Sequence, residues 1–263
     1  MEPTLKFVNY EADGPVRVIR LNRPERRNAL GVEMLADLSA AFRAYEADEE
    51  ARVAILTAAG STFCSGKDLK EGGSGLALSE SEPNPFLVKR IPSAPPVRRA
   101  GFVKPVIAAL NGGAAGGGFF MAVLADLIVA STASFLQISE VGLGLPVGWN
   151  IGPDFGLSRH AAAELALGQR VSPERALQMG LVCRVVEPEA LLDEAMAMAK
   201  EIAGRPPRAI EDNLTLLADA YEQGNDELWE RATKMREAAQ GSHDFREARA
   251  AFAEKRPPKF TGR

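Results

Sequence analysis

The sequence contains only two cysteines, Cys64 and Cys183, in 263 residues. Two cysteines cannot form the multiple-disulfide framework of a small secreted domain, and their spacing matches no zinc-binding motif. We therefore expect a protein of a reducing compartment, the cytoplasm, without a bound metal ion.

Long apolar runs are missing as well. The first residues, MEPTLKFVNYEADG, are charged and alternating, and they lack the apolar core of a secretory signal. No apolar run approaches the ~20 residues that a membrane-spanning helix needs.

Positive charge is not in excess either, because the chain has 31 Lys and Arg residues against 35 Asp and Glu, for a formal net charge of -4. We expect a soluble protein that binds neither membranes nor nucleic acid.

Apolar residues, by contrast, make up 46% of the chain, enough for a sizeable core. Strand patterns alternate with helical spacing through the first two thirds, and the pattern becomes helical from about Pro153. Strand, strand, helix units recur, so the sequence predicts an α/β fold followed by a helical C-terminal region. The expected strands are 5–10 and 16–21 (joined as a hairpin), 53–57, 106–110 and 127–130; the expected helices are 32 to the acidic run at 48–50, 160–167, 173–179, 191–202, 208–221, 226–239 and 243–254.

One long segment, 71–103, shows neither pattern. A loop of this length in a compact domain is either functional or disordered. Phe86, Leu87, Val88 and Ile91 indicate that part of it packs as a short helix over a pocket.

The segment from Gly112 to Gly118 has five glycines in seven residues, between an apolar strand and two phenylalanines. Glycine lets a backbone approach a ligand closely, and at a helix N-terminus it exposes N–H groups. A dinucleotide pyrophosphate is one candidate ligand, but the expected acidic residue about 20 positions further on is absent, since Asp126 follows Gly118 by only eight. Tight strand-to-helix packing is a second explanation. A third is an oxyanion site shared with the small-residue turn at 62–69, each turn giving one N–H to a single oxygen.

Seven segments occur in the order in which the crotonase, or enoyl-CoA hydratase/isomerase, family has them, and they span nearly the whole chain. The segments are LNRPERRNAL (21–30), FCSGKDLKE (63–71), KPVIAALNGGAAGGGF (104–119), ADLIVAS (125–131), SEVGLGLP (139–146), ALQMGLVCRVV (176–186) and FREARAAFAEKRPPKF (245–260). The chain resembles this family. The resemblance implies a crotonase-like spiral of ββα units with an acyl-CoA site in residues 1–200. It also implies a helical oligomerisation region in 201–263 that forms a homotrimer or a dimer of trimers.

By this resemblance, the main-chain N–H groups of Lys67 and Gly117 form an oxyanion hole for the carbonyl of an acyl-CoA thioester. Removing a proton beside a thioester builds enolate charge on that oxygen, and one donor there is worth about 3–4 kcal/mol. A side chain at Gly117 would keep the thioester away.

Hydratases of the family carry two glutamates, and here Phe120 stands at the first position while Glu140 keeps the second. A single carboxylate suffices to move a double bond, so isomerisation of an enoyl-CoA is favoured, with Glu140 carrying the proton. Burial beside Phe119, Phe120 and Leu143 would raise its pKa toward neutrality. A hydratase or a hydroxyacyl-CoA lyase using the same glutamate is the alternative. A catalytically silent CoA-binding oligomer is another, because half of the carboxylate pair is absent. For Glu140 itself, the alternative to a proton carrier is a paired structural acid.

Trp149, Asn150 and Asp154 depart from the usual family pattern after Glu140. Asp154 is either a second carboxylate or an acid at a helix N-terminus. A Cys64 nucleophile is disfavoured, because the only histidines, His160 and His243, lie in helical segments that the resemblance does not place at the site.

CoA brings a 3′-phosphate and a pyrophosphate, which basic side chains bind. CoA enters as part of the substrate, so no separate cofactor is expected. The remaining residues that the resemblance assigns to CoA or acyl binding are Arg26, Arg27, Ser65, Asp68, Leu69, Gly116, Phe120, Trp149, Lys255 and Phe260, the last two acting on a neighbouring subunit's CoA.

Overall fold

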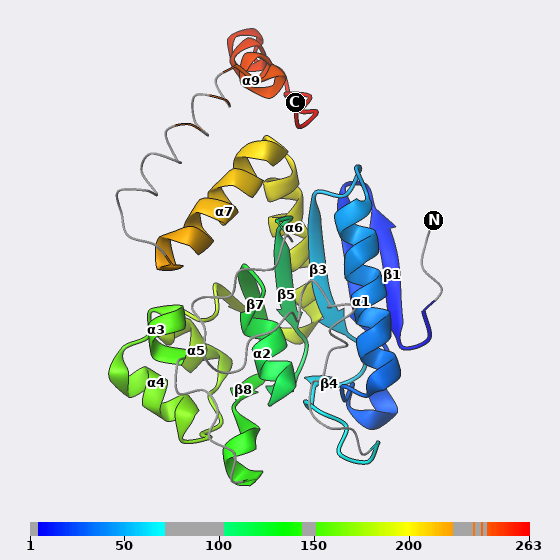
Figure 1. Ribbon diagram of the computed structural model, residues 1–263, viewed down its shortest axis with the longest axis vertical. Coiled ribbons are helices and arrows are strands. Elements are labelled where there is room, and N and C mark those ends of the chain that lie inside the picture. Colours follow the sequence, from blue (N-terminus) through cyan, green and yellow to red (C-terminus); the bar gives the residue numbers. More distant parts are fainter. Residues whose placement is uncertain (1–4, 72–102, 144–150, 223–233, 235–237, 239–240) are drawn as a thin grey trace.

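The computed structural model describes residues 5–71, 103–143, 151–222, 234, 238 and 241–263. It contains a six-stranded sheet of order β1-β2-β3-β5-β7-β9 and a three-stranded sheet of order β4-β6-β8 (Figure 1). The strands are β1 (Val8–Asp13), β2 (Val16–Leu21), β3 (Val53–Ala58), β4 (Thr62–Cys64), β5 (Val106–Leu110), β6 (Gly113–Ala115), β7 (Leu127–Ser131), β8 (Phe135–Gln137) and β9 (Arg184–Val186).

Helices α1 and α6 pack on opposite faces of the larger sheet. The helices α3, α4, α5, α7 and α9 also follow β8 in the chain, as α6 does. Figure 1 shows α7 and α9 at one end of the molecule, with the small sheet and α3 to α5 at the other. The helices are α1 (Val32–Ala47), α2 (Gly117–Val123), α3 (Ile151–Phe155), α4 (Arg159–Ala166), α5 (Pro173–Met179), α6 (Leu191–Ala203), α7 (Pro207–Glu222) and α9 (His243–Glu254); the 3-10 turns are η1 (Pro24–Arg26), η2 (Ser139–Leu143) and η3 (Pro188–Ala190).

Local sequence sets the ends of these helices, as α5 illustrates. The Ser172 side chain accepts a hydrogen bond from the N–H of Arg175 at 3.2 Å, and proline occupies the first helical position, Pro173. Gly180 then ends the helix with φ 82°, a left-handed conformation that glycine adopts without strain. The helix therefore has the bounds that the sequence predicts.

Two clusters of apolar side chains lie on opposite faces of the larger sheet. Successive residues of a strand point to opposite faces. Leu56 of β3 accordingly packs in the cluster with Phe42 of α1, whereas Ile55 packs in the cluster with Ala195 of α6. All four side chains are fully buried, and burying each Leu, Ile or Phe stabilises the fold by about 1.5–3 kcal/mol. The two layers bury both faces of the sheet, and the glycine stretch follows its interior strand β5.

Pairs of consecutive strands repeat along the chain. In β3-β4, β5-β6 and β7-β8, the first strand joins the larger sheet and the second joins the smaller one. Within each sheet these strands pair in parallel. Of the predicted strand, strand, helix unit, the strand pair therefore recurs, and within the described residues an α-helix completes it in β1-β2-α1 and in β5-β6-α2, which contains the glycine stretch.

Most predicted elements are confirmed. The hairpin β1-β2 turns at Gly14, whose φ is 55°. The short strands β4, β6, β8 and β9 were not expected, and the strand at 5–10 begins three residues later, at Val8. Residues 72–102, with the short helix proposed there, and most of 226–239 lie outside the described residues. None of the helices described is long and apolar enough to cross a membrane. The domain division at residue 200 stays a prediction.

Candidate active site

Two turns meet at the ends of β4 and β6, which are parallel neighbours. They pack so closely that side chains would not fit between them. A Cβ at Gly66 would lie 2.9 Å from the carbonyl oxygen of Ala115 and 3.1 Å from the nitrogen of Gly117, and a Cβ at Gly118 would overlap the Cys64 carbonyl. The glycines therefore bring the turn after Cys64 against the start of α2.

The main-chain amide of Lys67 is oriented by a bridge to Leu30. The N–H of Leu30 donates to the Gly66 oxygen at 2.8 Å, and the N–H of Asp68 donates to the Leu30 oxygen at 3.1 Å. Successive peptide groups of an extended segment point in opposite directions. The N–H of Lys67 therefore points away from Leu30.

Gly117 is the first residue of α2, so its N–H has no acceptor within the helix. Gly116 precedes it with φ 55° and ψ −125°, a conformation reserved for glycine. The N–H of Phe120 donates to the Gly116 oxygen at 3.1 Å and closes the first turn. This turn presents the Gly117 amide at the point where β6 becomes α2.

Glu140 lies in η2, directly after β8, and its carboxylate reaches the same turn. The N–H of Gly116 donates to the Gln137 oxygen at 3.0 Å, which ties β6 to β8. A Cβ at Gly116 would lie 2.8 Å from Ser139 Oγ and 3.0 Å from Glu140 Oε1. The carboxylate is therefore in contact with the residue next to Gly117.

The Glu140 carboxylate is poorly solvated. Its Oε2 atom is buried without a hydrogen-bond partner, and no cation within the described part of the chain pairs with it. Burial raises the pKa of Glu140 above the usual 4.5, in the direction expected of a base that works near neutral pH. A poorly solvated carboxylate beside the helix-start amide of Gly117 is suited to taking up and returning a proton.

Phe120 occupies the position at which a two-glutamate hydratase would have its first carboxylate. Its ring packs edge to face on Phe119, with centroids 5.2 Å apart, and is half-buried against the main core. Phe119 is fully buried. The side chain at position 120 therefore contributes apolar surface and has no group that can transfer a proton.

A buried ion-pair cluster that the sequence did not indicate lies beside the Lys67 turn. Arg23 pairs with Asp68 at 3.2 Å and with Glu71 at 2.7 Å, while Arg26 lies 3.8 Å from Asp68. Burial alone would raise the pKa of Asp68, but the hydrogen bond from the Lys70 N–H and the nearby Arg26 and Arg23 guanidinium groups hold it below its usual value. Asp68 therefore anchors the loop that carries Arg26.

The 21–30 loop also holds the turn at 62–65. Arg27 and Asn28 both adopt left-handed φ values of 51°. The Arg27 oxygen accepts from the Ser65 N–H at 3.1 Å, so two residues assigned to CoA lie together. The buried Asn28 side chain donates to the carbonyls of Ala59 and Thr62 and accepts from the Arg23 N–H. Asn28 is a structural residue that the sequence pattern did not single out.

Other predicted residues are not brought to this turn. Lys255 is exposed after α9, and the Phe260 oxygen accepts from Arg52 at 3.5 Å; α9 lies far from α2 in Figure 1. Leu69 is exposed two residues after Lys67. Trp149 and Asn150 lie outside the described residues, as does the side chain of Asp154.

Cys64 is buried, and burial raises the pKa of its thiol to about 12. It is therefore protonated at neutral pH, which agrees with its exclusion as a nucleophile. The residues with known placement contain no group of three His, Cys, Asp or Glu side chains that could hold a metal ion.

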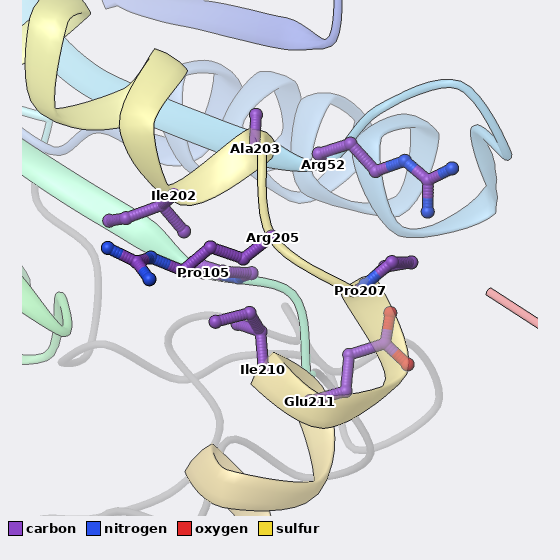
Figure 2. Close-up of a pocket in the computed structure, with 8 residues that line it drawn as sticks. All are labelled: Arg52, Pro105, Ile202, Ala203, Arg205, Pro207, Ile210 and Glu211. Atoms are coloured by element: carbon purple, nitrogen blue, oxygen red, sulfur yellow. The ribbon is translucent and has the colours of Figure 1, made fainter. Parts of the chain in front are cut away.

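A separate hollow lies between the end of α6, the start of α7 and Pro105, as Figure 2 shows. Pro105 precedes β5, whereas the glycine turn follows the other end of that strand. The hollow is therefore remote from Glu140. It is lined by Arg52, Pro105, Ile202, Ala203, Arg205, Pro207, Ile210 and Glu211.

Known proteins resemble this chain over nearly its whole length. Residues 11–263 match the protein family described as enoyl-CoA hydratase/isomerase. The chain is 36% identical over 260 residues to a probable enoyl-CoA hydratase of Mycobacterium leprae, with 96% of this chain and 98% of the relative covered. It is 33% identical over 267 residues to the 1,2-epoxyphenylacetyl-CoA isomerase of Escherichia coli, with 98% and 100% covered.

A solved structure shares the fold. The crystal structure of an enoyl-CoA hydratase from Mycobacterium tuberculosis superposes with a TM-score of 0.85 at 32% identity, covering 98% of this chain and 99% of that one. The predicted crotonase-like α/β fold is therefore confirmed.

Proposed function

Because the chain belongs to the enoyl-CoA hydratase/isomerase family and is an acyl-CoA enzyme of that family, we propose that it moves the double bond of an enoyl-CoA by a proton shift. The main-chain N–H groups of Lys67 and Gly117 bind the thioester oxygen. Glu140 is the one carboxylate that carries the proton.

In the proposed reaction, a 3-enoyl-CoA thioester places its carbonyl oxygen on the two amides. The Glu140 carboxylate removes a proton from C2, and the electrons of that C–H bond form a dienolate whose charge rests on the thioester oxygen. Each amide stabilises this charge by about 3–4 kcal/mol. The protonated Glu140 then returns its proton to C4, which leaves the double bond between C2 and C3 and restores the carboxylate.

The observation that carries this proposal is the environment of Glu140. Its Oε1 contacts Gly116 beside the Gly117 amide, its Oε2 has no partner, and Phe120 offers no second carboxylate. A lone, desolvated carboxylate suits a group that must bind a proton and release the same proton one step later.

The test is incubation of the protein with 3-enoyl-CoA and, separately, with 2-enoyl-CoA, followed by product analysis. A shifted double bond without 3-hydroxyacyl-CoA is the expected result. Exclusive formation of 3-hydroxyacyl-CoA contradicts the isomerase proposal and favours a hydratase. Absence of any turnover together with acyl-CoA binding favours a catalytically silent binding protein.

For the rest of the substrate, we propose that the CoA nucleotide lies along the 21–30 loop. Arg26 and Arg27 bind its phosphates, and the Ser65 main chain contacts the adenine. Lys255 and Phe260 reach the CoA of a neighbouring subunit in a homotrimer or a dimer of trimers. Light scattering coupled to size-exclusion chromatography measures the assembly, and a monomer at micromolar concentration contradicts this part of the proposal.

A further inference from the structure

One arginine holds both ends of the short loop that follows the Lys67 amide. The Arg23 guanidinium pairs with Asp68 at 3.2 Å through Nη1 and with Glu71 at 2.7 Å through Nη2. The side chains of Arg23 and Asp68 are 10% and 5% exposed, and that of Glu71 is 33% exposed. The loop from Asp68 to Glu71 is therefore closed by one shared, largely buried guanidinium group.

Glu71 also binds the start of α1. Its Oε2 atom accepts a hydrogen bond from the Val32 N–H at 3.2 Å. Val32 is the first residue of this 16-residue helix, and Gly31, at the N-cap, has no side chain that could accept such a bond. A Cβ at Gly31 would overlap the Glu71 carboxylate. The glycine thus leaves room for an acid from a distant segment to cap the helix.

The Lys67 peptide is part of a ladder of hydrogen bonds between residues 30–32 and 66–71. Two main-chain bonds of Leu30, at 2.8 Å and 3.1 Å, flank Lys67 in this ladder. The bond from the first N–H of α1 to Glu71 is the third. The first two are made by the main chain alone, whereas the third depends on the Glu71 side chain. A substitution at position 71 therefore loosens one end of the ladder without altering either proposed amide donor.

We propose that Glu71 is a positioning residue, which fixes the direction of the Lys67 amide by joining its loop to Arg23 and to the start of α1. The inference rests on the proposed function, because the direction of this amide matters only if its N–H binds the thioester oxygen. A donor works in an oxyanion hole when it lies about 2.7–3.1 Å from the oxyanion. A misplacement of about 1 Å costs roughly 10²-fold in rate.

The test measures kcat, KM and the infrared thioester carbonyl band of bound acyl-CoA in variants of Glu71. We expect Glu71→Ala to lower kcat by about 10–100-fold, with a much smaller change in KM, because the weakened interaction is strongest in the transition state. The carbonyl band, shifted to lower frequency in the unmodified protein, moves back toward that of free acyl-CoA. Glu71→Gln keeps an acceptor for the Val32 N–H and retains more of the activity.

Gly31→Ala disturbs the same carboxylate without removing it. The φ of Gly31 is −92°, which alanine adopts without strain, so the variant only adds a methyl group that displaces Glu71. We expect the same loss of kcat, and no further loss when Gly31→Ala is added to Glu71→Ala. Glu33→Gln is the matched control, because Glu33 lies in the same first turn of α1 but pairs with Lys6 on the surface. It should leave kcat and KM unchanged.

A Glu71→Ala protein with lowered thermal stability but unchanged kcat and carbonyl band overturns the inference, because Glu71 then has a merely structural role. Equal losses of kcat in Glu71→Ala and Glu33→Gln overturn it as well. Should Glu71→Ala fail to fold, Gly31→Ala provides the same comparison. These results leave the proposed function standing if the unmodified protein moves the double bond. An unshifted carbonyl band in the unmodified protein, or no movement of the double bond, contradicts the proposed function itself.

Discussion

The carboxylate of Glu140 lies against the Cα of Gly116, so close that a methyl group added there would come within 3.0 Å of Oε1. These two residues, 24 positions apart in the sequence, are in contact because β6 and β8 pair in parallel. Gly116 directly follows β6, and Glu140 lies in the turn after β8. The contact joins the proposed proton carrier to the turn that presents the Gly117 amide.

Replacing the proton carrier tests its role. Glu140→Gln keeps the shape of the side chain but cannot accept a proton, so we expect turnover to fall by about 10²–10⁴-fold while acyl-CoA binding is retained. Steady-state kinetics and calorimetry measure the two effects. Glu174→Gln, on the exposed surface of α5, is the control and should change neither. Unchanged turnover in the Glu140 variant would refute the assignment.

The raised pKa of Glu140 predicts a pH dependence of the rate. The carboxylate must be ionised to remove a proton, so kcat/KM should decline on the acid side at a pH above 4.5, the usual glutamate value. A pH profile with a non-sticky substrate measures this. An acid limb at or below 4.5 would contradict a desolvated base.

The raised pKa of Glu140 also predicts that ionisation of this carboxyl group destabilises the folded state, whereas ionisation of a salt-bridged acid stabilises it. A carboxyl group whose pKa is higher in the folded state imposes no cost below 4.5 and destabilises the fold as pH rises through the folded value. Glu140→Gln should therefore raise the Tm at pH 7 and have little effect at pH 4. A lower Tm at pH 7 would indicate that the carboxylate has a stabilising partner.

The backbone of the turn predicts a sharp difference between two glycines. Gly116→Ala places a Cβ on Ser139 and Glu140 in a conformation that alanine adopts only at a cost of about 1–3 kcal/mol. We expect lost activity and reduced thermal stability. Gly142→Ala is the matched control in η2, because nothing lies within 4 Å of its added Cβ. Equal activity of the two variants would show that the close contact of Gly116 with Ser139 and Glu140 is not needed for activity.

The ion-pair cluster beside Lys67 predicts a structural role for Asp68. Asp68→Asn removes one acidic partner of the buried Arg23, which keeps Glu71 at 2.7 Å and Glu25 at 4.0 Å. The free energy of unfolding should therefore fall by about 2 kcal/mol, the worth of one charged hydrogen bond. Because the pKa of Asp68 is lowered in the fold, its stabilisation is present above 3.8 and is lost as pH falls below that value. Urea unfolding at pH 7 and pH 3 measures both, and equal stability of the variant at pH 7 would contradict the assignment.

Periodic patterns were sufficient to predict the long elements. The apolar spacing from Val32 identified α1, and the sequences of α5 and α9 gave their bounds. The three-residue strands β4, β6 and β8 could not be predicted, because a run that short has no measurable period and β6 begins with glycine. Their pairing is non-local, and it is this pairing that assembles the site.

The candidate site was predictable only in part. Glycines and a retained glutamate in family order indicated Lys67, Gly117 and Glu140. The structure places these residues at or next to the turns of Gly66 and Gly116. Their roles stay predictions. The Arg23–Asp68 pair joins residues 45 apart, and no local pattern signals such a contact. The same holds for Ser139, whose approach to Gly116 depends on the β6–β8 register.

Infrared difference spectroscopy of a bound acyl-CoA, labelled with ¹³C at the thioester carbonyl, tests the central claim most directly. Two amides that donate to the thioester oxygen polarise the C=O bond, so the account predicts that its stretching band moves to lower frequency on binding. It also predicts that the shift persists in Glu140→Gln, which leaves both amides in place. A carbonyl band at the frequency of free acyl-CoA, in a complex shown to be saturated, would contradict the account.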